Sequence, residues 1–378
     1  MNILIVKLSA VGDVIHTLPS LAALRRCYPA ADITWVVEEA AADLLARHPA
    51  LNRIIVSRRK TWLRQFRQGR LAAPLREMTA FVRELRQRPY EVVIDFHGLL
   101  KSALIVALSG GKRRIGYASL QEMSGLFYNE KIPEDMGKHA VDRYLDLVRY
   151  LAGTEAPKSM TALERPPEFT IAIGTEEERR VKALLERHAE ILGEGKAPFV
   201  SVSPVAFWET KLWEEKRFAV LCDRIRRELG LGIVMTGSEA GPLAGIQERM
   251  ETQAVNLGGQ TSLRELACLY RKAALVVTTD SGPMHLAAAM GTPVVALFGP
   301  TDPGRTGPYG PGHLVIRSRL ACTPCFRKKC ATKACMAEIT VDKVFKALKE
   351  ILRGNGLLQE ETGPGACPQG EGMDRGNQ

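Results

Sequence analysis

One stretch of the sequence reads Thr278-Thr-Asp-Ser-Gly-Pro-Met-His-Leu-Ala-Ala-Ala-Met-Gly-Thr-Pro-Val-Val-Ala-Leu-Phe-Gly-Pro-Thr-Asp-Pro303. It predicts an apolar strand that ends at a short polar loop, then a small-residue helix and a second apolar strand. Such a helix start presents free backbone N–H groups and partial positive charge, which suits a phosphate group. Gly282 lets a ligand approach closely, and Pro283 is tolerated at the first helical position. The alternative is an ordinary strand–turn–helix corner that binds nothing.

Apolar segments of strand length alternate with amphipathic helical segments in both halves of the chain. The predicted strands are residues 2–7, 32–37, 53–56, 91–95, 113–116, 199–203, 233–236, 254–257, 274–278 and 294–297. The predicted helices include residues 14–27, 73–88, 101–108 and 341–352. Continuous apolar strands separated by helices predict an α/β fold whose parallel sheets are covered on both faces.

Residues 153–167 interrupt this alternation and are predicted to form a linker. We therefore expect a first domain over residues 1–152, a second over residues 168–353, and a disordered tail over residues 354–378. The predicted architecture is two doubly wound, Rossmann-like domains facing a central cleft. Ligands of such sheets bind beyond the carboxyl ends of the strands.

Composition bounds the class of protein. The chain has 378 residues, 46% of them hydrophobic and 25% charged, which is typical of a globular protein. It contains no apolar run of 18 residues, and its N-terminus is predicted to be a strand rather than a signal peptide, so we expect a cytoplasmic protein. A net charge of +10 indicates a polyanionic partner: nucleic acid, anionic lipid or a phosphorylated substrate.

The loop after the first strand reads Lys7-Leu-Ser-Ala-Val-Gly-Asp13. It lacks the glycines of a dinucleotide-binding fingerprint and instead places an acid at a helix start. Asp13 has two interpretations, a helix cap and a catalytic carboxylate facing a nucleotide loop of the other domain, and we favour the second.

At this point the sequence resembles a known family. Lys7-Leu-Ser-Ala-Val-Gly-Asp-Val-Ile-His-Thr-Leu-Pro19, Asp280-Ser-Gly-Pro-Met-His285 and Phe298-Gly-Pro-Thr-Asp-Pro303 are similar to the paired signatures of the lipopolysaccharide heptosyltransferases. The segments 35–39, 93–103, 126–129 and 139–143 resemble the members that add the first heptose. The likeness covers most of residues 1–345, in matching order and spacing. The family consists of inverting glycosyltransferases with the two-domain GT-B architecture.

The resemblance implies ADP-activated L-glycero-D-manno-heptose as donor, the Kdo region of lipid A as acceptor, and no cofactor beyond the co-substrate. It makes Asp13 the base that removes the acceptor proton. Lys211 matches the lysine that binds the phosphates. The implied donor site comprises Ser203, Lys211, Thr236, Gly237, Ser238, Glu239, Thr261, Asp280, Ser281, Gly282, Pro283 and His285. Stabilising a departing diphosphate requires cations and N–H groups, which these residues can provide.

Basic residues of the first domain are candidates for binding an anionic acceptor. Residues 57–70 interleave Arg58, Arg59 and Lys60 with Trp62 and other apolar side chains. This pattern suits the headgroup layer of an anionic membrane, and equally a solvated loop with its aromatic residues buried. Two further candidates, at other strand ends, are Lys101 and Arg114. The protein would then act at the inner face of the inner membrane.

Eight cysteines are present. Cys27, Cys222 and Cys268 lie in apolar helical segments and are predicted to be buried. The remaining cluster, Cys322-x2-Cys325-x4-Cys330-x4-Cys335, has spacing compatible with a structural zinc site, although reduced and packed thiols are the favoured interpretation. A similar cluster is found in the family members that add the second heptose.

Three functions remain open on the sequence. The favoured one is an ADP-heptose transferase acting on Kdo-lipid A. The second is a transferase of the same fold that uses another nucleotide sugar for another surface glycan. The third is a non-catalytic basic protein that binds membranes or nucleic acid. We expect no nucleic-acid partner, because the sequence has no nucleic-acid-binding motif and the phosphate loops would then have no role.

Overall fold

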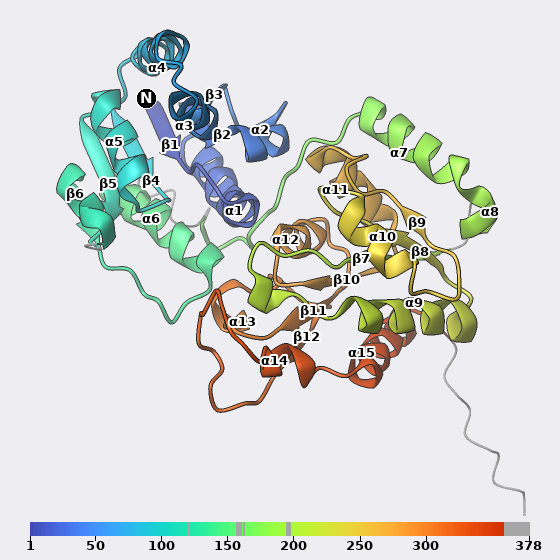
Figure 1. Ribbon diagram of the computed structural model, residues 1–378. Coiled ribbons are helices and arrows are strands. Elements are labelled where there is room, and N and C mark those ends of the chain that lie inside the picture. Colours follow the sequence, from blue (N-terminus) through green and yellow to red (C-terminus); the bar gives the residue numbers. More distant parts are fainter. Residues whose placement is uncertain (119–120, 156–160, 162, 194–197, 359–378) are drawn as a thin grey trace, which may run out of the picture.

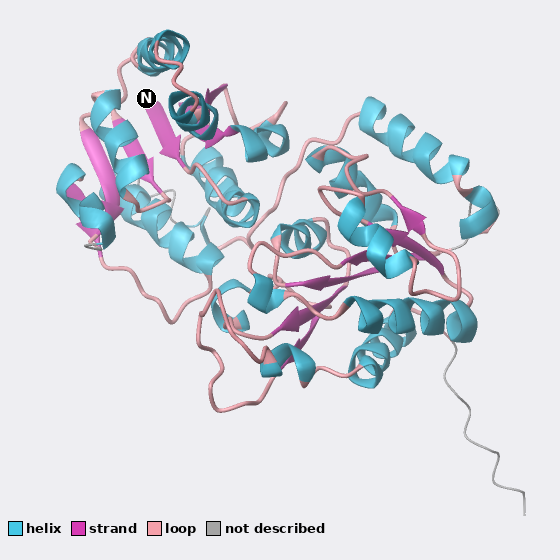
Figure 2. Ribbon diagram, viewed as in Figure 1, coloured by secondary structure: helices cyan, strands magenta, loops and turns pink. Residues whose placement is uncertain are grey.

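The computed structural model describes residues 1–118, 121–155, 161, 163–193 and 198–358. It contains two parallel sheets, each of six strands and each covered by helices (Figures 1 and 2). The predicted α/β architecture of two doubly wound sheets is therefore confirmed. No helix in the described part of the chain is both long and apolar enough to cross a membrane.

The first sheet has the strand order β3-β2-β1-β4-β5-β6. Its strands are β1 (Asn2–Val6), β2 (Asp32–Glu38), β3 (Arg53–Ser57), β4 (Val92–Asp95), β5 (Arg113–Tyr117) and β6 (Glu130–Ile132). Its helices are α1 (Val11–Cys27), α2 (Glu39–Leu45), α3 (Arg59–Arg67), α4 (Ala72–Leu85), α5 (Leu100–Ser109), η1 (Gln121–Phe127) and α6 (Ala140–Glu155).

The second sheet has the strand order β12-β11-β10-β7-β8-β9. Its strands are β7 (Phe199–Ser203), β8 (Gly232–Met235), β9 (Val255–Asn256), β10 (Leu275–Thr279), β11 (Val294–Phe298) and β12 (Leu314–Arg317). The accompanying helices are α7 (Thr175–Arg187), α8 (Ala189–Leu192), η3 (Glu209–Lys211), α9 (Glu215–Leu229), α10 (Gly241–Gln247), α11 (Leu263–Lys272), α12 (Gly282–Ala289), α13 (Pro303–Thr306), α14 (Ala334–Ala337) and α15 (Val341–Gly354).

The alternation of side chains along β1 explains how helices cover both faces of the first sheet. Ile3 and Ile5 point into the apolar core that includes α1 and α6. Leu4 and Val6 point into a second core, which α3, α4 and α5 close from the other side. A strand buried on both faces requires a continuous apolar sequence, as β1 has.

In both sheets the order of the strands reverses at the first strand of the sheet. In the first, β1 lies between β2 and β4; in the second, β7 lies between β8 and β10. Loops that leave neighbouring strands at such a point diverge, and ligands of open α/β sheets bind in the resulting crevice. The loops that begin after Val6, Ser203 and Thr279 all start at these points.

The domain boundaries stay predictions, and some elements differ from the expected pattern. Helix α6 continues to Glu155 and α15 to Gly354, one turn or less beyond the predicted ends. The predicted linker lies partly, and the predicted tail mostly, outside the described residues. Strands β6 and β12 were not predicted; both are short strands at the sheet edges, and of their residues only Ile132 is buried.

Candidate functional site

Asp13 lies in the first turn of α1, three residues after the N-cap residue Ala10. Its Oδ2 atom accepts the Ala10 N–H at 3.0 Å, so the carboxylate does cap the helix start. One oxygen is sufficient for that bond. The capping interpretation and the catalytic interpretation are therefore compatible, because Oδ1 faces elsewhere.

A buried lysine and tyrosine lie behind Asp13. The Tyr144 hydroxyl points at Asp13 Oδ1 from 3.5 Å and accepts a hydrogen bond from Lys7 Nζ at 2.7 Å. Lys7 Nζ also donates to the Phe96 carbonyl at 2.8 Å. Burial lowers the pKa of Lys7 and raises the pKa of Tyr144. The chain from Lys7 through Tyr144 to Asp13 fixes the carboxylate from within the first domain.

In the second domain, Asp280 and Lys211 form a buried ion pair. Lys211 Nζ lies 2.6 Å from Asp280 Oδ2 and 4.5 Å from the centre of the Trp208 ring. The Thr301 hydroxyl donates to the same Asp280 oxygen at 2.6 Å. The structure thus brings together a cation that follows β7, a carboxylate that follows β10 and a hydroxyl that follows β11.

The start of α12 is open to a ligand. Ser281 is its N-cap residue, but the Ser281 side chain makes no capping bond and donates instead to the Thr279 carbonyl at 3.2 Å. Pro283 occupies the first turn, as predicted. A helix start without a side-chain cap leaves N–H groups and partial positive charge for an anion.

The two signature loops contact each other. A Cβ atom at Gly12 would collide with the imidazole ring of His285, so α1 can approach α12 this closely only with glycine at that position. Gly282 faces Val11 in the same contact. The His16 and His285 rings share a hydrogen bond between Nε2 and Nδ1 at 2.9 Å.

His285 is the point at which the groups of both domains converge. Burial lowers its pKa to about 4, and the charges of Asp280, Asp13, His139 and Lys211 all act on it. The loops that carry Asp13 and Asp280 therefore meet at one buried imidazole, since Gly12, next to Asp13, lies against the His285 ring.

The residues predicted to bind adenosine divide into two groups. Ser203 and Thr236 are buried, and their hydroxyls bond within the protein, to the Thr236 carbonyl at 3.3 Å and to the Tyr270 hydroxyl at 3.0 Å. Their side chains position the strand ends and do not face a cleft. Gly237, Ser238, Glu239 and Thr261 lie in the loops after β8 and β9, which pack against each other through Gly258. Ser238 and Glu239 are exposed.

Three of the five predicted acceptor residues surround the buried carboxylate of Glu38. Arg59 lies 3.1 Å, Lys60 3.6 Å and Lys101 3.9 Å from its oxygens. Lys101 also donates to Ser9 Oγ at 3.2 Å, in the loop that carries Asp13. A hollow of about 310 Å³ next to this cluster is lined by Glu38, Glu39, Ala40, Ser57 and Lys60.

The other two predicted acceptor residues, Arg58 and Arg114, contact other groups. Arg58 pairs with Glu39 at 2.8 Å and with Glu77 at 3.5 Å. Arg114 lies near the amino end of β5, at the opposite edge of the sheet, and donates to the carbonyls of Phe127 and Gly111. The sequence placed it at a strand end but did not distinguish which end.

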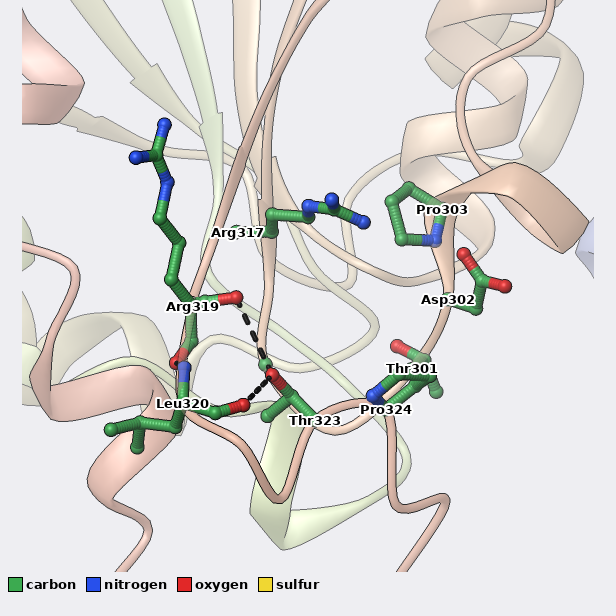
Figure 3. A pocket seen from close by; sticks show the side chains of 10 residues that line it. Thr301, Asp302, Pro303, Arg317, Arg319, Leu320, Thr323 and Pro324 are labelled. Atoms are coloured by element: carbon green, nitrogen blue, oxygen red, sulfur yellow. Dashed lines mark hydrogen bonds between the residues drawn. The ribbon is translucent and has the colours of Figure 1, made fainter.

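A cavity of about 370 Å³ lies beside Asp280, beyond the ends of β11 and β12 (Figure 3). Arg317 extends across it toward Asp302 and Pro303. Asp302 Oδ1 already accepts the Gly304 N–H at 2.9 Å. Because Thr301 lines the cavity and also bonds Asp280, this hollow adjoins the Lys211–Asp280 pair.

Cys27, Cys222 and Cys268 are buried, as predicted. In the other cluster Cys322 and Cys330 are exposed, Cys325 is partly exposed and only Cys335 is buried. Within the described ranges no three His, Cys, Asp or Glu side chains are grouped so as to hold a metal ion.

Several residues of the site were not singled out by the sequence. Lys7, His16, Glu38 and Thr301 stand inside the quoted segments, so their positions gave a signal but their partners did not. Tyr144 acquires its role only through contacts between distant segments.

Comparisons with known proteins fit this geometry. The family described as "Glycosyltransferase family 9 (heptosyltransferase)" matches residues 78–336. Lipopolysaccharide heptosyltransferase 1 of Pseudomonas aeruginosa is 32% identical over 340 residues, which cover 87% of each chain. The structure of Escherichia coli heptosyltransferase WaaC with ADP-2-deoxy-2-fluoro heptose has a TM-score of 0.71 at 26% identity, covering 93% of this chain and 99% of that one. The family 9 glycosyl transferase of Veillonella parvula shares the fold, with a TM-score of 0.78 at 23% identity and coverage of 93% and 97%.

Proposed function

Because the chain belongs to glycosyltransferase family 9, the heptosyltransferase family, we propose that it transfers L-glycero-D-manno-heptose from ADP-heptose to the Kdo region of the lipopolysaccharide inner core, with inversion. The observation that carries this proposal is the contact between the two signature loops, where Gly12, next to Asp13, lies against the His285 ring of the helix that follows Asp280. The Asp13 carboxylate can accept a proton and Lys211 can bind a diphosphate, and the two residues belong to different domains.

The proposed reaction is a single displacement. An acceptor hydroxyl attacks the anomeric carbon of the heptose and passes its proton to the Asp13 carboxylate. A new glycosidic C–O bond forms while the C–O bond to the diphosphate breaks, and ADP leaves with the electron pair. A base of this kind contributes about 10²- to 10⁴-fold to the rate.

Lys211 is the proposed partner of the departing diphosphate. In the structure without ligand its ammonium group is held by Asp280 and lies against Trp208, so it is already oriented. The uncapped start of α12 adds N–H groups. These fixed donors would stabilise negative charge as it develops on ADP, and the proposed reaction therefore requires no cofactor beyond the co-substrate. The fluoro-heptose complex of the E. coli relative supports ADP-heptose as the donor.

The exposed loops after β8 and β9 are the proposed adenosine site. Glu239 and Ser238 are exposed there, beyond the ends of their strands. A carboxylate at this edge suits the hydroxyls of a ribose. Ser203 and Thr236 would contribute by fixing the strand ends and not by direct contact.

The cluster around Glu38 is the proposed acceptor site. Arg59, Lys60 and Lys101 share a single buried carboxylate, so positive charge remains for an acidic sugar. The contact of Lys101 with Ser9 connects this cluster to the loop that carries Asp13. Kdo carries a carboxylate, which Arg and Lys bind through charge-assisted hydrogen bonds. We propose that the enzyme meets this acceptor at the cytoplasmic face of the inner membrane.

The second candidate is transfer of a different sugar on the same scaffold, because the diphosphate contacts do not distinguish sugars. Release of the nucleoside diphosphate should therefore be measured with Kdo₂-lipid A and three donors: ADP-heptose and ADP-glucose, which would release ADP, and UDP-glucose, which would release UDP. The proposal predicts that ADP is released with ADP-heptose and that neither of the other two donors reacts. NMR of the product should show an inverted anomeric configuration. Equal turnover of UDP-glucose, or a retained configuration, would contradict it.

A further inference from the structure

Helices α3, α4 and α5 carry an unusual share of the exposed apolar side chains. Of the 17 large apolar residues that are exposed in the described part of the chain, nine lie between residues 63 and 126. They are Leu63, Leu71, Leu75, Met78, Leu100, Leu104, Leu108, Met123 and Leu126. Leu71, Leu75 and Leu126 are 62%, 54% and 70% exposed. A few scattered leucines need no explanation, but a concentration on one side of one domain does.

The exposed residues form stripes along the helices. On α4 and its N-cap they recur at residues 71, 75 and 78, and on α5 at residues 100, 104 and 108, which is the spacing of one helical face. On α5 the buried residues, such as Val106, lie opposite the exposed stripe. On α4 the buried Phe81 follows Met78 by three residues and lies on the flank next to the stripe. The exposed residues of both stripes lie outside the core.

The three helices form one continuous surface, which we call the docking face. The rings of Trp62 on α3 and Phe81 on α4 lie 5.6 Å apart. Arg86 at the end of α4 donates to the Leu108 carbonyl of α5 at 2.7 Å. Residues of η1 pack beside α5, where Ser124 donates to the Gly98 carbonyl. Figure 1 shows α3, α4 and α5 on the side of the first sheet away from the second domain.

Positive charge surrounds these stripes. Residues 59–86 contain eight basic and two acidic side chains, so this segment supplies six of the ten net charges of the protein. Both acids are occupied: Glu77 by Trp62 and Arg58, and Glu84 by Arg53. Five exposed arginines of the segment form no ion pair with another described residue: Arg64, Arg67, Arg70, Arg76 and Arg83.

The docking face borders the proposed acceptor site. The first residues of α3 are Arg59 and Lys60, which reach Glu38, and the second residue of α5 is Lys101, which reaches Glu38 and Ser9. A molecule lying on α3–α5 would therefore be adjacent to the entrance to that cluster.

We propose that the docking face binds the surface of an anionic lipid bilayer and so holds the acceptor cluster against the headgroup layer. Leucines in stripes would enter the headgroup boundary while the flanking arginines meet lipid phosphates. Charge complementarity selects this occupant, because a second copy of the chain would bring the same excess of arginines against itself. The inference that the bound lipid is the acceptor rests on the proposed function; docking itself does not.

The test is co-sedimentation of the full chain with vesicles of phosphatidylglycerol and phosphatidylethanolamine, compared with phosphatidylcholine vesicles. Wild type should bind the anionic vesicles, and binding should weaken with salt. Replacing the leucines (Leu71→Ser, Leu75→Ser, Leu104→Ser) or the arginines (Arg67→Gln, Arg70→Gln, Arg76→Gln) should each reduce binding at least tenfold. Matched controls elsewhere on the surface are Val220→Ser on α9 and Arg179→Gln with Arg187→Gln on α7, which should bind like wild type.

Turnover with a Kdo acceptor that lacks acyl chains separates docking from catalysis. The docking-face variants should keep this activity, which also shows that they fold. Vesicle binding without any heptose transfer by wild type would overturn the proposed function and leave docking intact. Absence of binding to anionic vesicles, equal loss in the control variants, or a dimer that the leucine variants dissociate would overturn the docking proposal.

Discussion

Lys211 and Asp280 form an ion pair, which gives the lysine a defined position. A diphosphate would share or replace this carboxylate partner. Replacing Lys211 with alanine should therefore weaken ADP binding by about 10- to 100-fold, the value of a hydrogen bond to a charged group, and should slow transfer at least as much. Calorimetric titration with ADP measures the first effect and steady-state turnover the second.

The matched control is Lys216→Ala, an exposed lysine on α9 that makes no ion pair with another described residue. It should bind ADP like wild type. Unchanged ADP affinity in the Lys211 variant would remove that residue from the diphosphate site.

Tyr144 orients Asp13 without reaching the substrate. The change Tyr144→Phe removes the hydroxyl between Lys7 Nζ and Asp13 Oδ1. Because the carboxylate loses the hydroxyl that orients it, we expect kcat to fall about tenfold while KM for ADP-heptose changes little. Tyr117→Phe, which removes a buried hydroxyl bonded to the Arg143 carbonyl, is the control and should keep the wild-type kcat. An equal fall of kcat in both variants would refute the positioning role.

The sequence indicated candidate residues for the chemistry but not the side chains that contact them. Asp13 and Asp280 stand in the quoted signatures and Lys211 matches the lysine of the resembled family, so all three could be singled out as candidates, and their roles stay predictions. Tyr144 is far from Lys7 and Asp13 along the chain, and no local pattern reports their contact. Which atom a side chain will touch depends on the packing of whole helices.

At the scale of elements, the contact between α1 and α12 is the decisive feature. It buries His16 and His285 against each other, near His139. Burial lowers the pKa of His285 to about 4, from about 6.5 in an unfolded chain. Asp280 and Asp13 oppose this effect, and His139 and Lys211 reinforce it.

This contact predicts acid sensitivity. Between about pH 4 and pH 6.5 the unfolded chain binds a proton that the folded His285 does not, so the free energy of unfolding falls as the pH drops through this window. By pH 5 the loss from this residue should be about 2 kcal/mol. Urea unfolding at pH 7 and pH 5 measures it. His48 and His97, whose pKa values are also lowered by burial, add to the effect in the wild type.

The variant His285→Gln should show a smaller loss of stability between these pH values, whereas His188→Gln, at the end of α7, should behave like wild type. An identical pH dependence in all three proteins would contradict the assignment to the α1–α12 contact.

Strands were predictable where apolar residues recur over the length of a strand. Strand β7 was predicted at its observed bounds, Phe199–Ser203, from the sequence Phe-Val-Ser-Val-Ser, and all five residues are buried. For the segment of α3 the sequence predicted either binding to a headgroup layer or a solvated loop with its aromatic residues buried, and it did not predict a helix. In the structure α3 buries Trp62, leaves Phe66 partly covered and exposes Leu63, so its aromatic residues anchor it to the sheet and its leucine does not. Amphipathic helices of this kind depend on the surface that receives them.

For the whole molecule, the two sheets are joined by more than the two signature loops. Arg264 of α11 pairs with Asp43 of α2 at 3.1 Å, and Arg26 of α1 pairs with Glu168 at 3.2 Å. A single cluster of buried apolar side chains includes both Leu18 of α1 and Met284 of α12. The sequence predicted two doubly wound units and a shared cleft. It could not predict how closely the units meet, because that depends on side chains from segments hundreds of residues apart.

The central claim is that a carboxylate of the first domain acts on a donor held by the second. Asp13→Asn tests it most directly, because the new amide oxygen can still accept the Ala10 N–H and keep the helix start capped. Heptose transfer and ADP affinity should be measured on the same preparation. We predict a fall in turnover of about 10²- to 10⁴-fold with ADP affinity within about twofold of wild type. Turnover within about tenfold of wild type, or a parallel loss of ADP affinity, would contradict the claim.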